Sequence, residues 1–182
     1  MNPQMKLFKQ LTNYSSQFIE EGIYKQQMLS FLTTAKEPFS RSNQDGHFTA
    51  SAFLLNSQGD KFFLLHHAKL QKWMQPGGHC DGDSDVLRVA IKEASEESGI
   101  NNIKFVSSEI FDIDIHRIPS SHGQETHLHY DVRFLLQTVD SEALLPNHES
   151  TDMIWADKSV AQKLALEHST ERMIEKWQKY KA

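Results

Sequence analysis

The sequence contains few of the features that define several large protein classes. Cys80 is its one cysteine among 182 residues, which excludes an intrachain disulfide and favours a reducing compartment. Its apolar runs stay well short of the roughly eighteen residues that a membrane-spanning helix needs, and the N-terminus lacks the apolar core of an export signal. A formal charge of −5 without a basic patch argues against nucleic-acid binding. We therefore expect a cytoplasmic protein that has neither a membrane nor a nucleic-acid partner.

Length and patterning suggest one domain with an N-terminal addition. The chain is long enough to enclose a full hydrophobic core. From Leu7 to Ala35 apolar residues recur at helical spacing, Gly22 divides them into two expected helices, and Pro38 ends the run. We predict that residues 1–37 form a helical extension and residues 38–182 the main domain. The extension should pack on that domain or on a second copy of the chain in a homodimer.

The pattern changes to strands after residue 46. Runs rich in Phe, Leu and Thr are separated by turn residues, and the segment 56–60 has the composition of a hairpin turn. The expected strands lie at residues 47–55, 61–66, 103–115 (one or two strands), 126–136 and 153–155, and residues 157–180 should form one or two helices.

Three glutamates share one stripe of a predicted central helix. Glu93, Glu96 and Glu97 have the spacing i, i+3, i+4, so their carboxylates should converge. Like charges at this spacing repel by a few tenths of a kcal/mol per pair, which a bound cation would relieve. Carboxylate and carbonyl oxygens are ligands that suit Mg²⁺ or Mn²⁺ rather than zinc.

The flanks of this helix carry start and stop signals. Asp83 or Ser84 should cap its N-terminus, and Gly99 should provide a left-handed C-terminal cap. Before it, Gly77 and Gly78 predict a loop that takes positive φ angles and brings main-chain carbonyls close to a ligand.

The segment resembles the Nudix box, whose pattern is Gly, five residues, Glu, seven residues, Arg-Glu-aliphatic, one residue, Glu-Glu, one residue, Gly-aliphatic. In this chain it runs from Gly78 to Ile100, with Ser84 in place of the first Glu and Lys92 in place of the Arg. The resemblance implies an α+β fold, a Nudix-like α/β/α sandwich with a mixed sheet, to which the helical extension is added.

The resemblance also implies a metal-dependent hydrolase that cleaves the diphosphate bridge of a nucleoside diphosphate linked to a group X. Its cofactor would be Mg²⁺ or Mn²⁺, and its partner a small nucleotide or diphosphate substrate. The metal ligands would be Glu93, Glu96 and Glu97 together with a main-chain carbonyl, that of Gly78 or of Gly77. Glu96 and Glu97 would be catalytic together with an acid outside the box, for which Glu149 is preferred to Asp152 and Glu125.

Histidines are frequent on and near the expected strand 126–136. His127 and His129 share a face of it, followed on the same side by Asp131. Such a pair binds transition metals in cupin folds, but the downstream Glu and Gly of that arrangement are missing. We expect a polar strand face along a pocket or solvent, with substrate contact as the alternative. His79, beside the glycines, is placed to contact phosphate.

Two other functions compete with hydrolysis. Ser84 and Lys92 make a catalytically silent, Nudix-like nucleotide-binding module credible, although the three glutamates argue against it. An isopentenyl-diphosphate isomerase with a Nudix fold would use a cysteine and a glutamate, but Cys80 lies in the wrong local setting. The sequence does not identify the group X.

Overall fold

Two helices precede a sheet in this protein, and further helices lie on both sides of it. The structure, a computed structural model, describes residues 2–120, 125–140, 143–145 and 148–180. The helices are α1 (Pro3–Asn13), α2 (Ile19–Thr34), α3 (Val86–Ser98), α4 (Lys158–Ala161) and α5 (His168–Tyr180). The strands are β1 (Gly46–Leu55), β2 (Phe62–His67), β3 (Lys72–Met74), β4 (Gly77–His79), β5 (Ile103–Phe105), β6 (Asp112–Ile118), β7 (His127–Thr138) and β8 (Ser150–Ala156).

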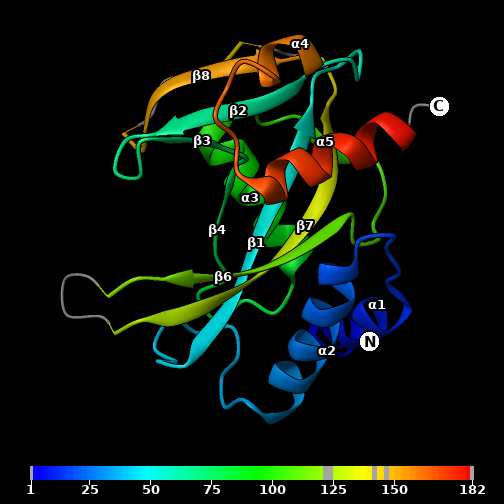
Figure 1. Cartoon of the computed structure of the whole chain (residues 1–182), viewed down its shortest axis with the longest axis vertical. Coiled ribbons are helices and arrows are strands. Elements are labelled where there is room, and N and C mark those ends of the chain that lie inside the picture. Colours follow the sequence, from blue (N-terminus) through cyan, green and yellow to red (C-terminus); the bar gives the residue numbers. More distant parts are fainter. Residues whose placement is uncertain (1, 121–124, 141–142, 146–147, 181–182) are drawn as a thin grey trace.

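The long strands β1 and β7 form the centre of the sheet (Figure 1). They run parallel, from the pair Gly46 and Leu128 to the pair Leu55 and Gln137. The outer edge of β1 pairs with β4 near one end and with β2 at the other, while the outer edge of β7 pairs with β6 and β5. Strands β3 and β8 pair with β2. This mixed sheet confirms the predicted fold class.

Alternating residues of β1 serve two hydrophobic cores. Ala50, Ala52 and Leu54 belong to the core that includes the buried face of α3. Phe53 and Leu55 belong to the second core, which includes the buried face of α5. Figure 1 shows α5 in front of the sheet and α3 behind it. The period of two along the strand thus produces the predicted α/β/α sandwich.

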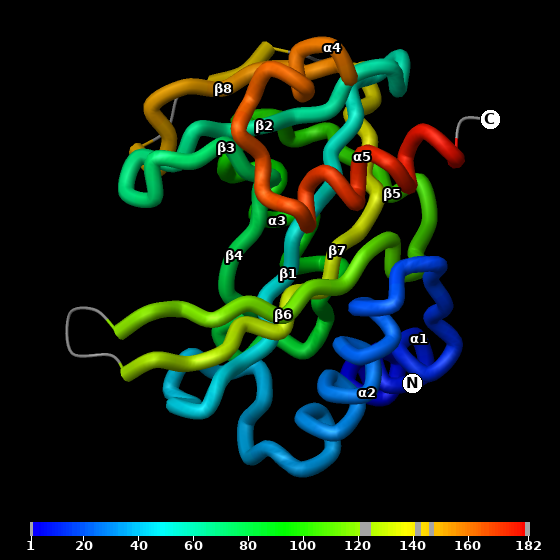
Figure 2. Tube along the Cα trace, viewed as in Figure 1, coloured from blue at the N-terminus to red at the C-terminus, as the bar shows by residue number. Residues whose placement is uncertain are grey.

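The N-terminal helices pack against the lower part of this sheet (Figure 2). Apolar residues of α1 and α2 belong to the same core as α3, and Phe31 stacks on Tyr130 with ring centroids 4.2 Å apart. The predicted division at Gly22 is wrong, because Gly22 lies inside α2. The break comes earlier, where the Ser16 hydroxyl accepts the Phe18 N–H at 3.1 Å before α2 begins.

Most of the other predicted helix and strand boundaries agree with the structure, but the predicted N-cap of α3 does not. The hairpin between β1 and β2 is confirmed, and the segment 103–115 divides into β5 and β6. Gly99 ends α3 with φ 76°, as predicted. Its N-cap is Asp85 rather than Asp83 or Ser84, because the Asp85 carboxylate accepts the Arg88 N–H at 3.3 Å. None of the helices described is both long and apolar enough to cross a membrane.

Candidate functional site

The predicted glutamate stripe lies where α3 faces β4. Glu97 is only 6% exposed, and its carboxylate accepts the Gly77 N–H at 2.7 Å. The Glu93 side chain is 15% exposed and lies against Gly78, whereas the Glu96 side chain is 59% exposed. The structure therefore brings two of the three carboxylates against the main chain of β4 and leaves the third at the surface.

The two glycines of β4 are needed for space rather than for backbone angles. Both lie in a strand, and neither has the positive φ that the sequence suggested, so that prediction is wrong. A Cβ atom on Gly78 would lie 2.5 Å from Oε2 of Glu93, and a Cβ on Gly77 would overlap the Ser51 side chain. Glycine at these positions lets α3 and β1 approach β4 closely from opposite sides.

The acidic cluster carries unfavourable negative charge. Burial raises the pKa of Glu97 to about 8, and the charges of Glu93, Glu149 and Glu96 add to the increase, while the Gly77 N–H acts against it. Burial also raises the pKa of Glu93, where Lys92 acts in the opposite direction. A cation beside these carboxylates would favour their ionised forms.

Lys92 lies on the outer side of the cluster. Its ammonium group is 3.1 Å from a carboxylate oxygen of both Glu93 and Glu96, and the side chain is 59% exposed. The lysine that departs from the box pattern therefore still provides positive charge to two of the three glutamates. At such an exposed position each ion pair contributes less than about 1 kcal/mol.

The three candidate acids outside the box lie in different places. Glu149 is exposed just before β8, and its charge raises the pKa of both Glu93 and Glu97. Asp152 is exposed on β8 opposite His66, and Glu125 precedes β7. The proximity of Glu149 to the cluster agrees with the preference for it, and its catalytic role stays a prediction.

The histidines on β7 belong to a larger cluster. The rings of His127 and His129 lie 5.2 Å apart on one face of the strand. His47 of β1, the register partner of His129, places its ring 5.1 Å from His127 and 4.7 Å from His129. The ring of His79 lies 5.1 Å from His47 and 5.0 Å from His129. Sequence analysis missed His47, since no local signal shows that β1 pairs with β7.

His47 and His129 are held in the neutral form. Burial, together with the neighbouring His79 and His127, lowers the pKa of His47 to about 4. Burial lowers the pKa of His129 to about 2, with contributions from His116 and His47 among others. At neutral pH both rings can therefore offer a lone pair to a cation or accept a hydrogen bond.

A buried ionic network continues from the histidine cluster along the same face of the sheet. Arg133 is 2% exposed and lies 2.7 Å from Asp131, 3.2 Å from Asp112 and 3.4 Å from Asp114. The Ser51 hydroxyl also donates to Asp131, at 2.8 Å. The network unites side chains of β1, β6 and β7, and Asp131 is the member that the sequence placed on the same strand face as the histidines.

The network extends to α2 and α5. The buried Glu21 carboxylate lies 2.5 Å from Lys176 and accepts the Ile113 N–H at 3.1 Å. Arg172 contacts Asp112 at 2.9 Å and donates to the Ile113 carbonyl at 2.8 Å. Two side chains therefore satisfy the main-chain groups of Ile113 that face away from β7. This protects the edge of β6 from pairing with another strand.

Cys80 has the surroundings of a structural thiol. It is 3% exposed, and burial together with the charge of Asp131 raises its pKa well above the usual range. A thiol in this state is a poor nucleophile. The structure thus argues against a reaction that depends on this cysteine.

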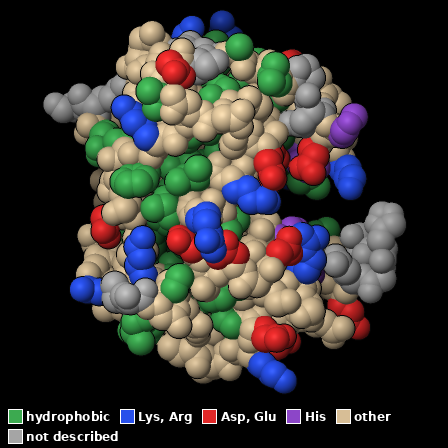
Figure 3. All heavy atoms as spheres, turned by 180° about the vertical axis from the view of Figure 1, so that it is seen from behind, with side chains coloured by type: hydrophobic (Ala, Val, Ile, Leu, Met, Phe, Trp, Pro, Cys, Tyr) green, Lys and Arg blue, Asp and Glu red, His purple; other side chains and the backbone are tan. Residues whose placement is uncertain are grey.

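Two depressions on the surface differ in their chemistry. A cavity of about 530 Å³ lies between the end of α1 and α5, lined by Tyr14, Phe111 and Lys176 among others, and contains none of the predicted site residues. The face opposite that of Figure 1 has an indentation at one edge, with acidic, basic and histidine side chains around it (Figure 3).

Comparisons with known proteins identify relatives of this chain. A family model described as "NUDIX domain" matches residues 46–177. A curated relative, "Probable DHNTP pyrophosphohydrolase" of Lactococcus lactis subsp. cremoris, is 30% identical over 105 residues, which are 57% of this chain and 61% of that protein. The chain thus spans about three-fifths of the length of this relative.

Solved structures share the fold at low sequence identity. The MutT protein from Methanosarcina mazei Go1 is 17% identical with a TM-score of 0.60, covering 76% of this chain and 96% of that one. A binary complex of the C. elegans Ap4A hydrolase is 18% identical with a TM-score of 0.58, covering 73% of this chain and 96% of that one. These similarities establish the architecture alone.

Proposed function

Because the chain belongs to the NUDIX domain family, we propose that it hydrolyses the diphosphate bridge of a nucleoside diphosphate linked to a further group. The proposal is supported by the curated relative described as a probable pyrophosphohydrolase, a name for an enzyme that cleaves a phosphoric anhydride. The group attached to the diphosphate is not specified by the residues of the site.

The pair formed by the buried Glu97 and the partly buried Glu93 is the observation that carries the proposal. Both carboxylates lie against the glycines of β4, and the pKa of Glu97 is raised to about 8. Two acids in one partly buried place destabilise a protein unless a cation or a proton compensates them. A bound divalent metal ion would offset this destabilisation, and we therefore propose that the pair binds such an ion.

The donor set fits Mg²⁺ or Mn²⁺. Carboxylate oxygens of Glu93, Glu96 and Glu97 and the carbonyl oxygen of Gly77 or Gly78 would hold the ion, and these hard oxygen ligands are those that both metals prefer. When bound, the ion would neutralise charge on the diphosphate and lower the pKa of the attacking water.

The surrounding residues would position the reactants. The Gly77 N–H fixes the orientation of the Glu97 carboxylate, and Lys92 restrains Glu93 and Glu96. We assign Glu149 the role of the acid outside the box, which accepts a proton from the attacking water together with Glu97. His79, His127 and His129, which were predicted to contact substrate, cluster on the face of β4 that points away from Glu93, and we assign them no step of the hydrolysis.

A screen for product release tests the proposal. The purified chain is incubated with nucleoside triphosphates, nucleoside-diphosphate sugars and dinucleoside polyphosphates, with Mg²⁺, with Mn²⁺ or with EDTA. We expect metal-dependent hydrolysis of at least one substrate class. Glu97→Gln should reduce it at least about a hundredfold, since metal ions contribute several kcal/mol to such reactions. Glu175→Gln, at a half-exposed glutamate of α5, is the matched control.

The same screen separates the alternatives. Binding of nucleotides without turnover would favour the silent module, and equal activity of Glu97→Gln and the control would show that the acidic cluster is not the metal site. Isomerisation of isopentenyl diphosphate is disfavoured by the burial of Cys80. Incubation of the same protein with isopentenyl diphosphate should therefore give no isomerised product.

A further inference from the structure

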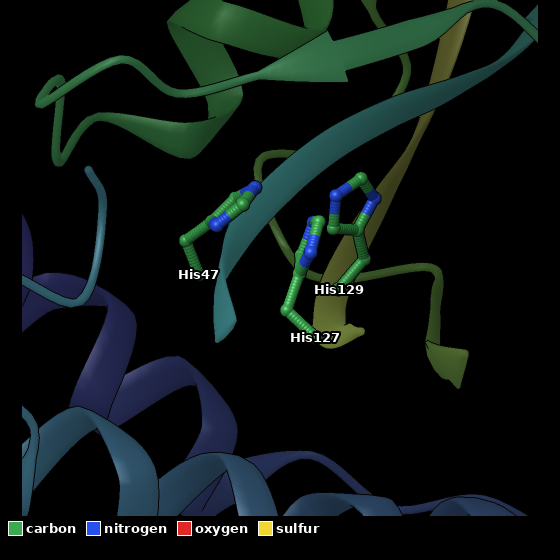
Figure 4. Close-up of side chains that lie close together, drawn as sticks. All are labelled: His47, His127 and His129. Carbon is green, nitrogen blue, oxygen red and sulfur yellow. The ribbon is translucent and has the colours of Figure 1, made fainter. Parts of the chain in front are cut away.

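We propose that His47, His127 and His129 form a second metal site, which binds a transition-metal ion such as Zn²⁺. One ring nitrogen from each residue lies within 4.8 Å of the others, and the three side chains come together between β1 and β7 (Figure 4). The site is distinct in position and chemistry from the acidic cluster.

The scaffold holds the three side chains in fixed relation. His47 and His129 are register partners on the two parallel central strands, and His127 lies two residues before His129 on the same face. Four-coordinate Zn²⁺ with Zn–N distances of 2.0–2.1 Å requires nitrogens about 3.4 Å apart. The ring nitrogens lie within 4.8 Å of one another, so binding would require the side chains to rotate and bring them closer.

Ring nitrogens without partners point to a missing ligand. His47 is 2% exposed, and neither its Nδ1 nor its Nε2 has a partner at hydrogen-bond distance, although the main chain of Asn43 lies near enough to oppose the lowering of its pKa. Nε2 of His129 is also buried without a partner. An unsatisfied buried polar group costs about 1–3 kcal/mol, and native proteins contain few of them. A metal ion would satisfy one nitrogen of each ring at once.

The hydrogen bond of His127 selects the tautomer that a metal needs. Its Nδ1 lies 2.9 Å from the main-chain carbonyl oxygen of Glu125, to which it donates its proton, leaving Nε2 as the lone-pair donor. This arrangement of carbonyl, imidazole and metal is common at protein metal sites. Three neutral imidazoles favour Zn²⁺, Co²⁺, Ni²⁺ or Cu²⁺ over Mg²⁺.

The β4 strand separates this site from the acidic cluster. Gly78 faces Glu93, and the next residue, His79, points to the opposite face, where its ring neighbours His47 and His129. His79 is therefore the nearest imidazole to a fourth coordination position. Loss of the acidic cluster should leave the histidine site intact.

Metal titration of the full chain tests this site. Metal-stripped protein is titrated with Zn²⁺ against a competing chelator, in excess Mg²⁺ so that the oxygen ligands are occupied. We expect one tight Zn²⁺ equivalent per chain that raises the melting temperature. His47→Gln and His127→Gln should each weaken Zn²⁺ binding at least about a hundredfold. Mutation of a residue that only hydrogen-bonds to a metal ligand already lowers metal affinity by roughly ten- to a hundredfold, and these variants remove a ligand itself.

Two control variants and one spectroscopic measurement complete the test. Glu97→Gln and His116→Gln, whose ring lies beside His129 but outside the three, should bind Zn²⁺ within about threefold of the unmodified chain. The visible spectrum of the Co²⁺ form of the unmodified chain should show the strong absorption of four-coordinate cobalt, a readout that requires no variant. The proposal is overturned if Zn²⁺ does not bind, if Co²⁺ shows only weak six-coordinate bands, or if binding is lost equally in either control.

Discussion

Replacing Glu97 with Gln should stabilise the metal-free protein at alkaline pH while it abolishes function. The side chain keeps its shape, and the amide oxygen can still accept the Gly77 N–H that the carboxylate accepts at 2.7 Å. What changes is the charge, because Gln stays neutral where Glu97 must ionise in a buried acidic cluster. The variant thus isolates the electrostatic cost of the site.

The magnitude follows from the pKa. The folded state raises the pKa of Glu97 from 4.5 to about 8, so between these values the folded protein binds a proton that the unfolded chain has lost. Stability therefore falls as pH rises through this window, by at most about 1.4 kcal/mol per pH unit and about 5 kcal/mol in all. Below pH 4.5 the carboxyl is protonated in both states, and its contribution is fully present.

Urea denaturation in EDTA at a series of pH values from 4.5 to 8.5 measures this effect. The stability of Glu97→Gln minus that of the unmodified chain should rise across the series, whereas Glu96→Gln, at a side chain 59% exposed, should give a nearly constant difference. Saturating Mg²⁺ should then stabilise the unmodified chain more than Glu97→Gln. A difference for Glu97→Gln that stays constant with pH would refute the reasoning.

Two further substitutions test how the site is supported, each with a matched control measured by urea denaturation. Glu21→Ala should cost at least about 1–3 kcal/mol, because it leaves the Ile113 N–H without an acceptor and removes one of the two carboxylates, Glu21 and Asp112, that pair with Lys176. Glu20→Gln, at the neighbouring and partly exposed position, should cost less than about 1 kcal/mol. Equal losses would contradict a buried network. Gly78→Ala should cost about 1–3 kcal/mol and reduce hydrolysis by displacing Glu93, whereas Gly22→Ala, where a Cβ meets open space, should stabilise α2 by about 0.5–1 kcal/mol. Hydrolysis unaffected by Gly78→Ala would contradict the close contact.

The sequence predicted elements whose signals are local. The end of α3 at Gly99 and the hairpin between β1 and β2 depend on neighbouring residues, and both were placed correctly. The N-cap of α3 moved to Asp85 because several adjacent acids compete for the same role. The helix break near Gly22 was wrong because glycine only permits a break, and the Ser16 turn makes one earlier.

The sequence could not predict features that depend on contacts between distant segments. His47 joins His129 through the parallel register of β1 and β7, which lie more than seventy residues apart. Glycine is likewise needed at position 77 because Ser51 of another strand lies too close for a Cβ atom. The sequence indicated that glycine matters here, but the expected positive φ is not the cause. Such contacts require the topology of the sheet to be known first.

The acidic cluster and the buried ionic network are joined by direct contacts through β1. The Gly77 N–H holds the Glu97 carboxylate, and Gly77 lies so close to Ser51 that no Cβ would fit between them. The Ser51 hydroxyl donates to Asp131 at 2.8 Å, and Arg133 donates to the same carboxylate at 2.7 Å. Displacing any member would leave a buried polar group unsatisfied, so the series resists deformation. Because the network also includes α2, residues that precede the matched NUDIX segment contribute to the support of its acidic cluster.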